Sequence, residues 1–184
     1  MPVNARHVEN SKITLTELMI PSYANFGGKI HGGILLSLMD KVAYACASKH
    51  SGNYCVTVNI DNVDFLNPVE VGDLVSLKAS VNYVGKTSLV VGIRVTAENV
   101  KTGEVRHTNT SYFTMVAKDE ANNPTIVPEL VLEKKVEVRR FLEALKRREL
   151  KKEYEAGFSN LKKHTNPEKE LSQLENERCQ LALA

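Results

Sequence analysis

The sequence of 184 residues has no tryptophan and only three cysteines, Cys46, Cys55 and Cys179. Their spacing matches no metal-ligand motif, and an odd number of cysteines is a poor basis for a disulfide framework. No apolar run reaches the ~18–20 residues that span a bilayer, and the first residues do not begin the apolar core of a signal peptide. We therefore expect a cytoplasmic protein with reduced thiols, no metal site and no integral membrane association.

The chain also lacks a large charge of one sign. A net charge of +2 is too small to indicate a nucleic-acid partner, and 42% apolar residues is typical of a globular protein. Residues 1–125 hold 11 basic and 11 acidic side chains, whereas residues 126–184 hold 13 and 11 in only 59 positions. We therefore predict one folded domain at residues 1–125 and a charged, largely helical C-terminal extension at residues 126–184.

One long apolar segment dominates the first domain. Residues 34–49 are rich in alanine and leucine, and their apolar side chains cover most of a helical circumference, which predicts a helix buried nearly all round. A single carboxylate, Asp40, lies inside this segment. Burying an unpaired charge costs several kcal/mol, so Asp40 needs a functional explanation.

Strand patterns surround this helix. Apolar and polar side chains alternate, or β-branched residues accumulate, in segments separated by glycine- or proline-containing turns: residues 12–20, 55–65, 74–84, 87–100 and 105–117. Short connections predict that the last four segments form an antiparallel meander. One sheet cannot cover the far side of the helix, so a second copy of the chain is expected there, as an obligate dimer.

The extension begins with a predicted helix over residues 131–158 and is broken at Asn166-Pro167. It has no sustained apolar heptad, so we predict no coiled coil. A solvated helix that packs on its own domain or on a neighbouring subunit, and a basic helix that binds a membrane or a partner, both remain open. The final segment, residues 168–183, forms a short helix or remains mobile.

Several motifs occur in order along the first domain. Asn25 precedes a His-Gly-Gly triplet at residues 31–33, and Asp40 follows seven residues after Gly33; then come Val56-Thr57-Val58, the segment Phe65–Asp73, and Gly85-Lys86-Thr87-Ser88. This series resembles the bacterial and vertebrate cytosolic acyl-CoA thioesterases of the hotdog fold. The resemblance covers residues 10–120 and implies an α+β fold, in which an antiparallel sheet wraps a long central helix.

The family resemblance implies hydrolysis of acyl-CoA to a fatty acid and CoA, with no cofactor beyond the substrate. It implies active sites at homodimer interfaces, in a trimer of dimers, that is, a hexamer. Its catalytic residues correspond to Asn25 and Asp40. By the same resemblance, the turn from Gly85 through Lys86 and Thr87 to Ser88 contacts CoA, and Thr57 lines the channel for its pantetheine arm.

The chemistry of these residues is consistent with thioester hydrolysis. Burial of Asp40 would raise the pKa of its carboxyl group and make it a base for water, although direct attack to give a mixed anhydride remains possible on the sequence alone. Free N–H groups at Gly32 and Gly33, at the helix start, would hold the thioester oxygen. Asn25 would orient water or donate to the same oxygen, and His31 supports the turn.

Helical geometry separates these groups. Gly33 and Asp40 are seven residues apart, which places them on nearly the same face but ~10 Å apart along the axis. A single thioester carbon cannot contact both. We therefore predict a composite site, with Asp40 from one protomer and Asn25, Gly32 and Gly33 from its partner.

Structural roles are the alternatives for each residue. Asp40 would bond to the adjacent loop, Asn25 would be a turn residue, Thr57 a strand residue, and residues 85–88 a hairpin turn. Two other functions compete at the level of the whole protein: a hotdog enoyl-CoA hydratase and a non-catalytic acyl-CoA sensor that recruits a partner. Neither is favoured, since no histidine with an accompanying acid stands in the position that a hydratase needs, and a sensor needs no base.

Overall fold

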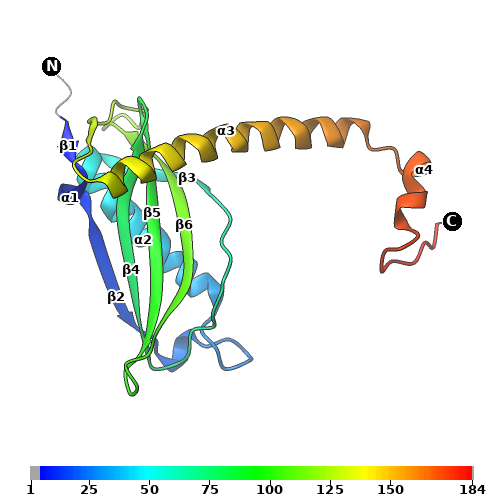
Figure 1. Cartoon of the computed structure of the whole chain (residues 1–184), viewed down its shortest axis with the longest axis horizontal. Coiled ribbons are helices and arrows are strands. Elements are labelled where there is room, and N and C mark those ends of the chain that lie inside the picture. Colours follow the sequence, from blue (N-terminus) through cyan, green and yellow to red (C-terminus); the bar gives the residue numbers. More distant parts are fainter. Residues whose placement is uncertain (1–4, 184) are drawn as a thin grey trace. The chain divides into compact units, whose positions relative to one another are not determined.

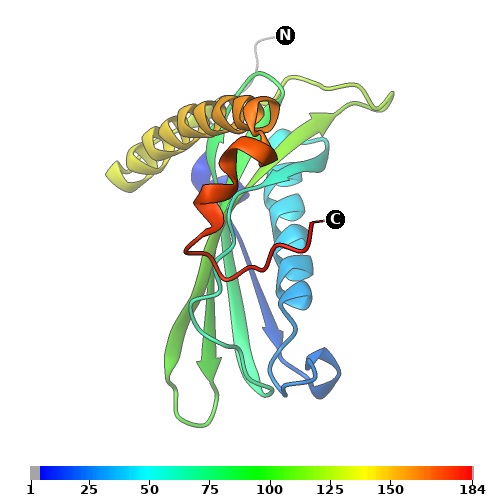
Figure 2. The same cartoon turned by 90° about the vertical axis from the view of Figure 1, so that its right-hand side faces the viewer.

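A curved antiparallel sheet wraps one side of a long helix in the computed structural model, which describes residues 5–183. The helix, α2 (Gly32–Ser51), lies along the inner face of the sheet (Figures 1 and 2). The five strands of the sheet are β2 (Ile13–Leu18), β3 (Tyr54–Ile60), β4 (Asp73–Val84), β5 (Ser88–Asn99) and β6 (Val105–Lys118). Their order across the sheet is β2-β4-β5-β6-β3.

Alternating side chains decide which face of each strand meets α2. In β4, Val75, Leu77 and Val81 are buried on the inner face, while Lys78 is exposed on the outer face. Strands β5 and β6 repeat this pattern, and their inner side chains join those of α2 in one core. Burial of a Val or Leu side chain contributes about 1.5–3 kcal/mol, so this shared core holds the helix against the sheet.

The predicted meander of four consecutive strands was wrong in one connection. β3 pairs with β6, from Tyr54 opposite Lys118 to Ile60 opposite Phe113, and β4 pairs with β2. β3 also ends at Ile60 instead of Phe65. The twelve residues 61–72 are therefore a crossing connection long enough to reach the other edge of the sheet, which leaves β3 as an edge strand.

The prediction that α2 is buried nearly all round was wrong for the single chain. The sheet covers one side, where Leu35, Met39, Val42 and Cys46 are at most 2% exposed. A stripe on the other side is exposed; it contains Gly33, Ser37, Asp40, Lys41 and Tyr44. The residues of this stripe recur every three to four positions, so they form one continuous helical face.

The remaining elements are short, except for one helix. They are β1 (Arg6–His7), α1 (Val8–Ser11), the 3₁₀ turn η1 (Pro21–Tyr23), β7 (Leu130–Val131), α3 (Lys135–His164), α4 (Pro167–Glu170) and η2 (Leu171–Leu174). α3 begins later than predicted because Val131 belongs to β7, which pairs with β1 in parallel. The break at Asn166 is confirmed: its side chain caps α4 by accepting the N–H groups of Glu168 and Lys169.

The chain forms two compact units that divide between Ala144 and Leu145, inside α3. Residues 126–144 thus belong to the unit that contains the sheet, and the assignment of a separate extension from residue 126 stays a prediction. Among residues 5–183, no helix is both long and apolar enough to cross a membrane.

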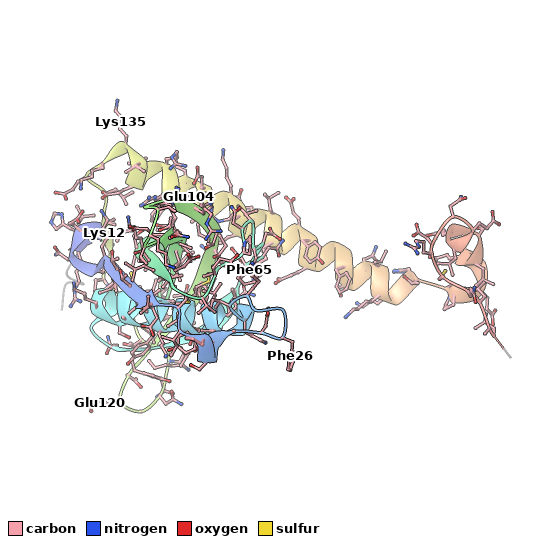
Figure 3. All side chains as sticks on the ribbon, turned by 90° about the horizontal axis from the view of Figure 1, so that it is seen from below. Lys12, Phe26, Phe65, Glu104, Glu120 and Lys135 are labelled. Atoms are coloured by element: carbon pink, nitrogen blue, oxygen red, sulfur yellow. The ribbon has the colours of Figure 1, made fainter. Side chains whose placement is uncertain are left out.

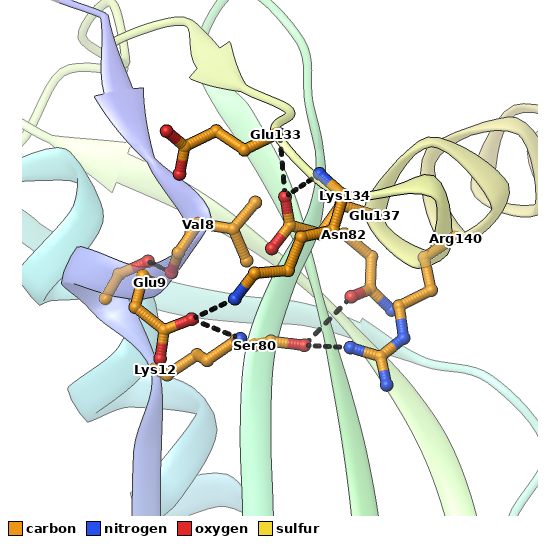
Figure 4. Close-up of polar contacts among 10 residues, drawn as sticks. Val8, Glu9, Lys12, Ser80, Asn82, Glu133, Lys134, Glu137 and Arg140 are labelled. Atoms are coloured by element: carbon orange, nitrogen blue, oxygen red, sulfur yellow. Dashed lines mark hydrogen bonds and ion pairs between the residues drawn. The ribbon is translucent and has the colours of Figure 1, made fainter.

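The start of α3 is fixed to the first unit by polar contacts (Figure 4). The Glu137 carboxylate is 4% exposed and accepts the backbone N–H groups of Glu133 and Lys134, at 2.9 and 3.1 Å. Lys134 and Lys12 both form ion pairs with Glu9. The exposed pairs contribute little energy, but the buried cap sets the direction in which α3 leaves β7.

Candidate active site

Asp40 lies on the exposed face of α2, with its carboxylate held by a neighbouring strand. The Oγ1 hydroxyl of Thr57, on β3, donates to Oδ1 of Asp40 at 2.6 Å. The pairing of β3 with β6 shifts register between Thr57 and Asn59, which marks a bulge directly after Thr57. Bulges re-aim side chains next to them, so the bulge and the helix together define where this hydrogen bond forms.

A shallow hollow of about 280 Å³ surrounds this pair. Its wall includes Tyr44 from α2 and Tyr54 from β3, whose ring centroids are 5.9 Å apart, and Met115 from β6. Asp40 itself is exposed, so the expected desolvation of its carboxylate is not provided by the single chain. A second chain over this face would be needed to exclude water from it.

Asn25 organises the loop before α2. Its side-chain Oδ1 accepts the N–H groups of Gly27 and Lys29, and its backbone N–H donates to the Lys29 carbonyl at 2.7 Å. Within residues 5–183, the amide nitrogen Nδ2 of Asn25 has no acceptor and remains available as a donor. The tip of the same loop presents Phe26, fully exposed and directed away from the domain (Figure 3).

The start of α2 differs from the sequence expectation in one donor. His31 is the N-cap of the helix, and its Nδ1 accepts the N–H of Gly33 at 2.9 Å. The Gly33 N–H was expected to be free and is not, because the imidazole satisfies it. Gly32, the first residue of the helix, has an N–H without a partner in the described part of the chain.

The two glycines differ in the room that they leave for a side chain. A Cβ on Gly33 would be 2.9 Å from the His31 ring, closer than side chains tolerate. A Cβ on Gly32 would meet the Phe65 ring at 3.4 Å. Phe65 comes from the crossing connection between β3 and β4, and sequence reasoning did not assign it to the site. Its place in the ordered series of motifs was the available signal.

The structure brings some predicted residues together and separates others. Asp40 and Thr57 line the same hollow, but Asn25, Gly32 and Gly33 do not border it. The helix start is about two turns from Asp40. It lies beside the connection that leads into β4, where the Ile30 N–H donates to the Val69 carbonyl. Within one chain, the Asp40 carboxylate is therefore separated from the predicted donors at Asn25 and Gly32.

The predicted CoA-binding turn lies at the other end of β4. Gly85 and Ser88 close it through a 2.7 Å backbone hydrogen bond, and Lys86 is exposed. Twelve residues of β4 span about 35–40 Å, so this turn is far from the start of α2 in the same chain. The register aligns Ser88, Val116 and Val56 in one row, while Thr57 points to the opposite face, toward α2.

The other reactive side chains have structural surroundings. Cys46 and Cys55 are buried core residues, as predicted, and burial raises the pKa of the Cys46 thiol to about 12. Asp73 is 2% exposed and bonds both to Arg106, at 2.7 Å, and to the Glu70 N–H. Among residues 5–183, no group of three or more His, Cys, Asp or Glu side chains is placed to hold a metal ion.

Known proteins resemble this chain in sequence. The sequence model of the thioesterase superfamily matches residues 27–104. Protein VdlD of Helicobacter pylori is 46% identical over 143 residues, which is 78% of this chain and 82% of that protein.

Solved structures agree in both sequence and fold. An apo-hexameric acyl-CoA thioesterase superposes with a TM-score of 0.81 at 37% identity, over 84% of this chain and 99% of that one. The acyl-CoA hydrolase of Staphylococcus aureus, solved with butyryl-CoA, CoA and CoA disulfide, has a TM-score of 0.78 at 29% identity, over 87% and 98% of the two chains.

The wrapped helix, the sheet order and the superfamily match define a hotdog-fold thioesterase. The chain belongs to the acyl-CoA thioesterase family and is an acyl-CoA thioester hydrolase. The predicted α+β hotdog fold is thereby confirmed, and hydrolysis is supported over the hydratase and sensor alternatives.

Proposed function

We propose that this enzyme hydrolyses acyl-CoA at a site shared by two copies of the chain. Asp40 of one protomer accepts a proton from water, and the start of α2 in the other protomer, with its Asn25, holds the thioester oxygen. The main support for this proposal is that these groups are far apart within one chain. The hollow that contains Asp40 and Thr57 is lined by no residue of the helix start.

The reaction follows from the chemistry of the groups. Water attacks the thioester carbon while Asp40 takes its proton. Negative charge develops on the carbonyl oxygen and is met by the Gly32 N–H and the Asn25 Nδ2, which have no competing acceptor in the described chain. Collapse of the intermediate breaks the carbon–sulfur bond, and the proton held by Asp40 passes to the CoA sulfur. The products are a free acid and CoA, and the proposed steps use only water and groups of this protein.

The role of His31 in this scheme is to position the helix start. Because its Nδ1 already accepts the Gly33 N–H, Gly33 supplies a donor to substrate only if the imidazole moves away. The Gly32 N–H is therefore the helix-start donor in our proposal, and the bonded His31–Gly33 pair keeps the first turn rigid around it.

Thr57 holds the base. Its hydroxyl donates to one oxygen of Asp40, which leaves the other oxygen to accept the proton from water. The spacing in a relative supports the choice of these three side chains. Solved variants of the Staphylococcus aureus hydrolase replace an asparagine, an aspartate and a threonine by alanine, at intervals of 15 and 17 residues. Asn25, Asp40 and Thr57 follow one another at the same intervals.

We further propose that the substrate-binding state is a homodimer, assembled as a trimer of dimers in the cytoplasm. The hexameric state stated for the related thioesterase supports this assembly. The exposed stripe of α2 and the edge strand β3, with exposed Tyr54, Val58 and Ile60, provide an apolar surface for the second copy. The same copy would exclude water from Asp40. The turn at Gly85, Lys86, Thr87 and Ser88 stays our candidate for contacts with the CoA phosphates.

A subunit-mixing experiment tests the shared site. Asp40→Ala and Asn25→Ala chains, each inactive alone, are unfolded and refolded together, and CoA release is measured with a thiol reagent. Random pairing makes half of the dimers mixed, and one of two sites in each is then intact, so about a quarter of wild-type activity should return.

The matched control mixes Asp40→Ala with Thr57→Ala. Both substitutions alter the same half of the site, so mixing creates no intact site and activity should not exceed that of the Thr57→Ala chain. Mass spectrometry confirms that mixed dimers form. Absence of recovery in confirmed mixed dimers of the first pair would overturn the shared site.

The route of water is tested separately. In a single turnover in ¹⁸O-labelled water, direct water attack places the label in the released acid. If Asp40 instead forms a mixed anhydride and water attacks the carbonyl carbon that belongs to Asp40, the label enters the Asp40 carboxylate. Peptide mass spectrometry detects a label in the enzyme. We expect the label in the acid.

A further inference from the structure

The outer face of the sheet carries a second polar site, remote from Asp40. A groove of about 410 Å³ lies between the outer surfaces of β2, β4, β5 and β6 and the first turns of α3. Five cationic side chains line it: Lys12, Lys78, Arg94, Arg139 and Arg140. Glu143 is the one carboxylate among the described lining residues, and Arg139 already binds it at 2.6 Å.

Two of these cations oppose each other directly in the sheet. Lys78 of β4 is the register partner of Arg94 of β5, with Thr14 and Thr110 on either side in the same row. Like charges on directly opposed residues destabilise a sheet. Both side chains are exposed, and neither forms an ion pair with a carboxylate within residues 5–183. No carboxylate in the described residues offsets the repulsion between Lys78 and Arg94, and a bound anion would offset it.

A buried amide points into the same groove. Asn82 is 5% exposed and lines the groove beyond Ser80. Arg140 Nη1 donates to Ser80 Oγ at 3.4 Å, so the Ser80 hydroxyl directs its hydrogen to Asn82 Oδ1, at 3.1 Å (Figure 4). This chain of bonds fixes the orientation of the amide and leaves Asn82 Nδ2 as a donor without an acceptor in the described part of the chain.

Two backbone features make room for this amide. The pairing of β4 and β5 shifts register between Val81 and Tyr83, so Asn82 is the extra residue of a bulge. Gly92, the register partner of Ser80 on β5, has no side chain, and a Cβ there would be 2.1 Å from Asn82 Nδ2. The glycine therefore admits the amide to a position that any other residue would fill.

We propose that this groove binds a ligand that carries a pyrophosphate group. Planar guanidinium groups, a lysine, hydroxyls and an amide donor suit phosphate oxygens. The row of Lys78 and Arg94 and the row that contains Ser80 are two residues, about 7 Å, apart along the strands. The short side chains of Ser80 and Asn82 would hold one phosphate, and the long side chains of Lys78 and Arg94, one row away, would hold a second phosphate linked to it. The volume falls within the range of sites for small ligands.

The groove differs from the thioesterase site in position and in residues. It lies on the outer face, whereas Asp40 and Thr57 face the inner side, where α2 packs. Free pyrophosphate, a nucleoside diphosphate and the pyrophosphate of CoA share the recognised chemistry, and the experiment separates them.

Isothermal titration calorimetry of the full chain with inorganic pyrophosphate, at constant ionic strength, tests the proposal. We expect one site per chain. Lys78→Glu and Arg94→Glu should each weaken binding at least 10-fold, and Asn82→Asp, which keeps the shape of the side chain but removes its donor, should do the same.

The matched control is Lys101→Glu, which makes the same change in net charge on the exposed turn after β5. It should leave pyrophosphate affinity within 2-fold. Titrations of ADP and CoA into the wild type and Arg94→Glu identify the source: the natural ligand class is the one whose binding is tightest and is lost in the variant. CoA binding that persists in Arg94→Glu belongs to the thioesterase site.

Circular dichroism shows whether each variant is folded, and the shape-preserving Asn82→Asp keeps the test decisive if a charge reversal unfolds the chain. Absence of pyrophosphate binding by the wild type, or binding that all three groove variants retain, would overturn the proposal. Equal weakening by Lys101→Glu would also overturn it, since the effect would then reflect net charge alone.

Discussion

The middle and the start of α2 differ in the chemistry that they offer to a substrate. The middle has a carboxylate, Asp40, fixed by Thr57 at 2.6 Å, and no residue of the helix start borders the hollow around it. The start has donors, at Gly32 and Asn25, and residues 25–33 include no Asp or Glu. Because a helix places consecutive turns 5.4 Å apart, one chain keeps these halves separate. This difference is the basis of our proposal that a second copy of the chain joins the two halves of the site.

Replacing the base should have the largest effect. Asp40→Asn keeps the shape and the contact with Thr57 but cannot take a proton from water. We expect kcat to fall about 10³–10⁴-fold with little change in KM, measured by CoA release. Glu98→Gln, the same chemical change at an exposed carboxylate on β5, should retain wild-type kcat. If kcat of Asp40→Asn falls by less than 10-fold, Asp40 is not the base that activates water.

Disturbing the helix start should have the next effect. In Gly33→Ala, the new Cβ meets the His31 ring at 2.9 Å and displaces the cap. We expect kcat to fall about 100-fold, since the Gly32 donor loses its fixed position, and the free energy of unfolding to fall by about 1 kcal/mol. Gly157→Ala is the control: its Cβ would meet nothing within 4 Å, so activity should not change. Full activity of Gly33→Ala would contradict a role for the cap in catalysis.

Removing the hydrogen bond to the base should have a smaller effect than removing the base. Thr57→Val deletes the donor at nearly constant volume and should lower kcat about 10-fold, the value expected for one hydrogen bond to a charged group. Thr57→Ser keeps the hydroxyl and should recover most of the activity. If serine and valine have equal effects, packing at the bulge matters and the hydrogen bond does not.

The smallest expected effect is on stability, through a buried histidine in the core behind α2. His50 is fully buried near the end of α2, and its Nε2 contacts the Pro128 carbonyl at 3.1 Å. Burial lowers the pKa of His50, the hydrogen bond to Pro128 opposes this, and Arg6 adds to the lowering.

The unfolded chain, with a histidine pKa near 6.5, therefore binds the proton before the folded chain does. Neutral His50 therefore contributes to the free energy of unfolding above about pH 6.5, and this contribution should be lost as the pH falls below that value. Thermal unfolding at several pH values measures this decline, which should be shallower in His50→Gln. An identical pH dependence in the two proteins would exclude His50 as its source.

Local sequence was sufficient for parts of the molecule with local causes. Sixteen residues of apolar helical pattern predicted α2 to within two residues at each end, and alternation located β2, β4 and β5 closely. Local pattern gave the wrong neighbour for β3, because a run of β-branched residues does not indicate which strand it pairs with. It also placed the start of α3 too early, because Val131 pairs with β1, far away in the sequence.

The site divides in the same way. Asp40 was recognisable from the sequence because a lone carboxylate interrupts an apolar helix, and its distance from Gly33 follows from helical rise alone. The hydrogen bond from Thr57, the capping of Gly33 by His31 and the exposure of Asp40 depend on how β3 and the preceding loop return to α2.

The sequence by itself therefore determined the helix, its odd carboxylate and the ordered motifs that indicate a thioesterase, because each rests on spacing within a few residues. Only the tertiary structure decided that β3 lies at the sheet edge beside Asp40, and that Lys78, Arg94 and Asn82 share a groove with the start of α3. Those arrangements arise from strand register and chain crossing, which join residues 16 to 60 positions apart through packing that no local pattern records.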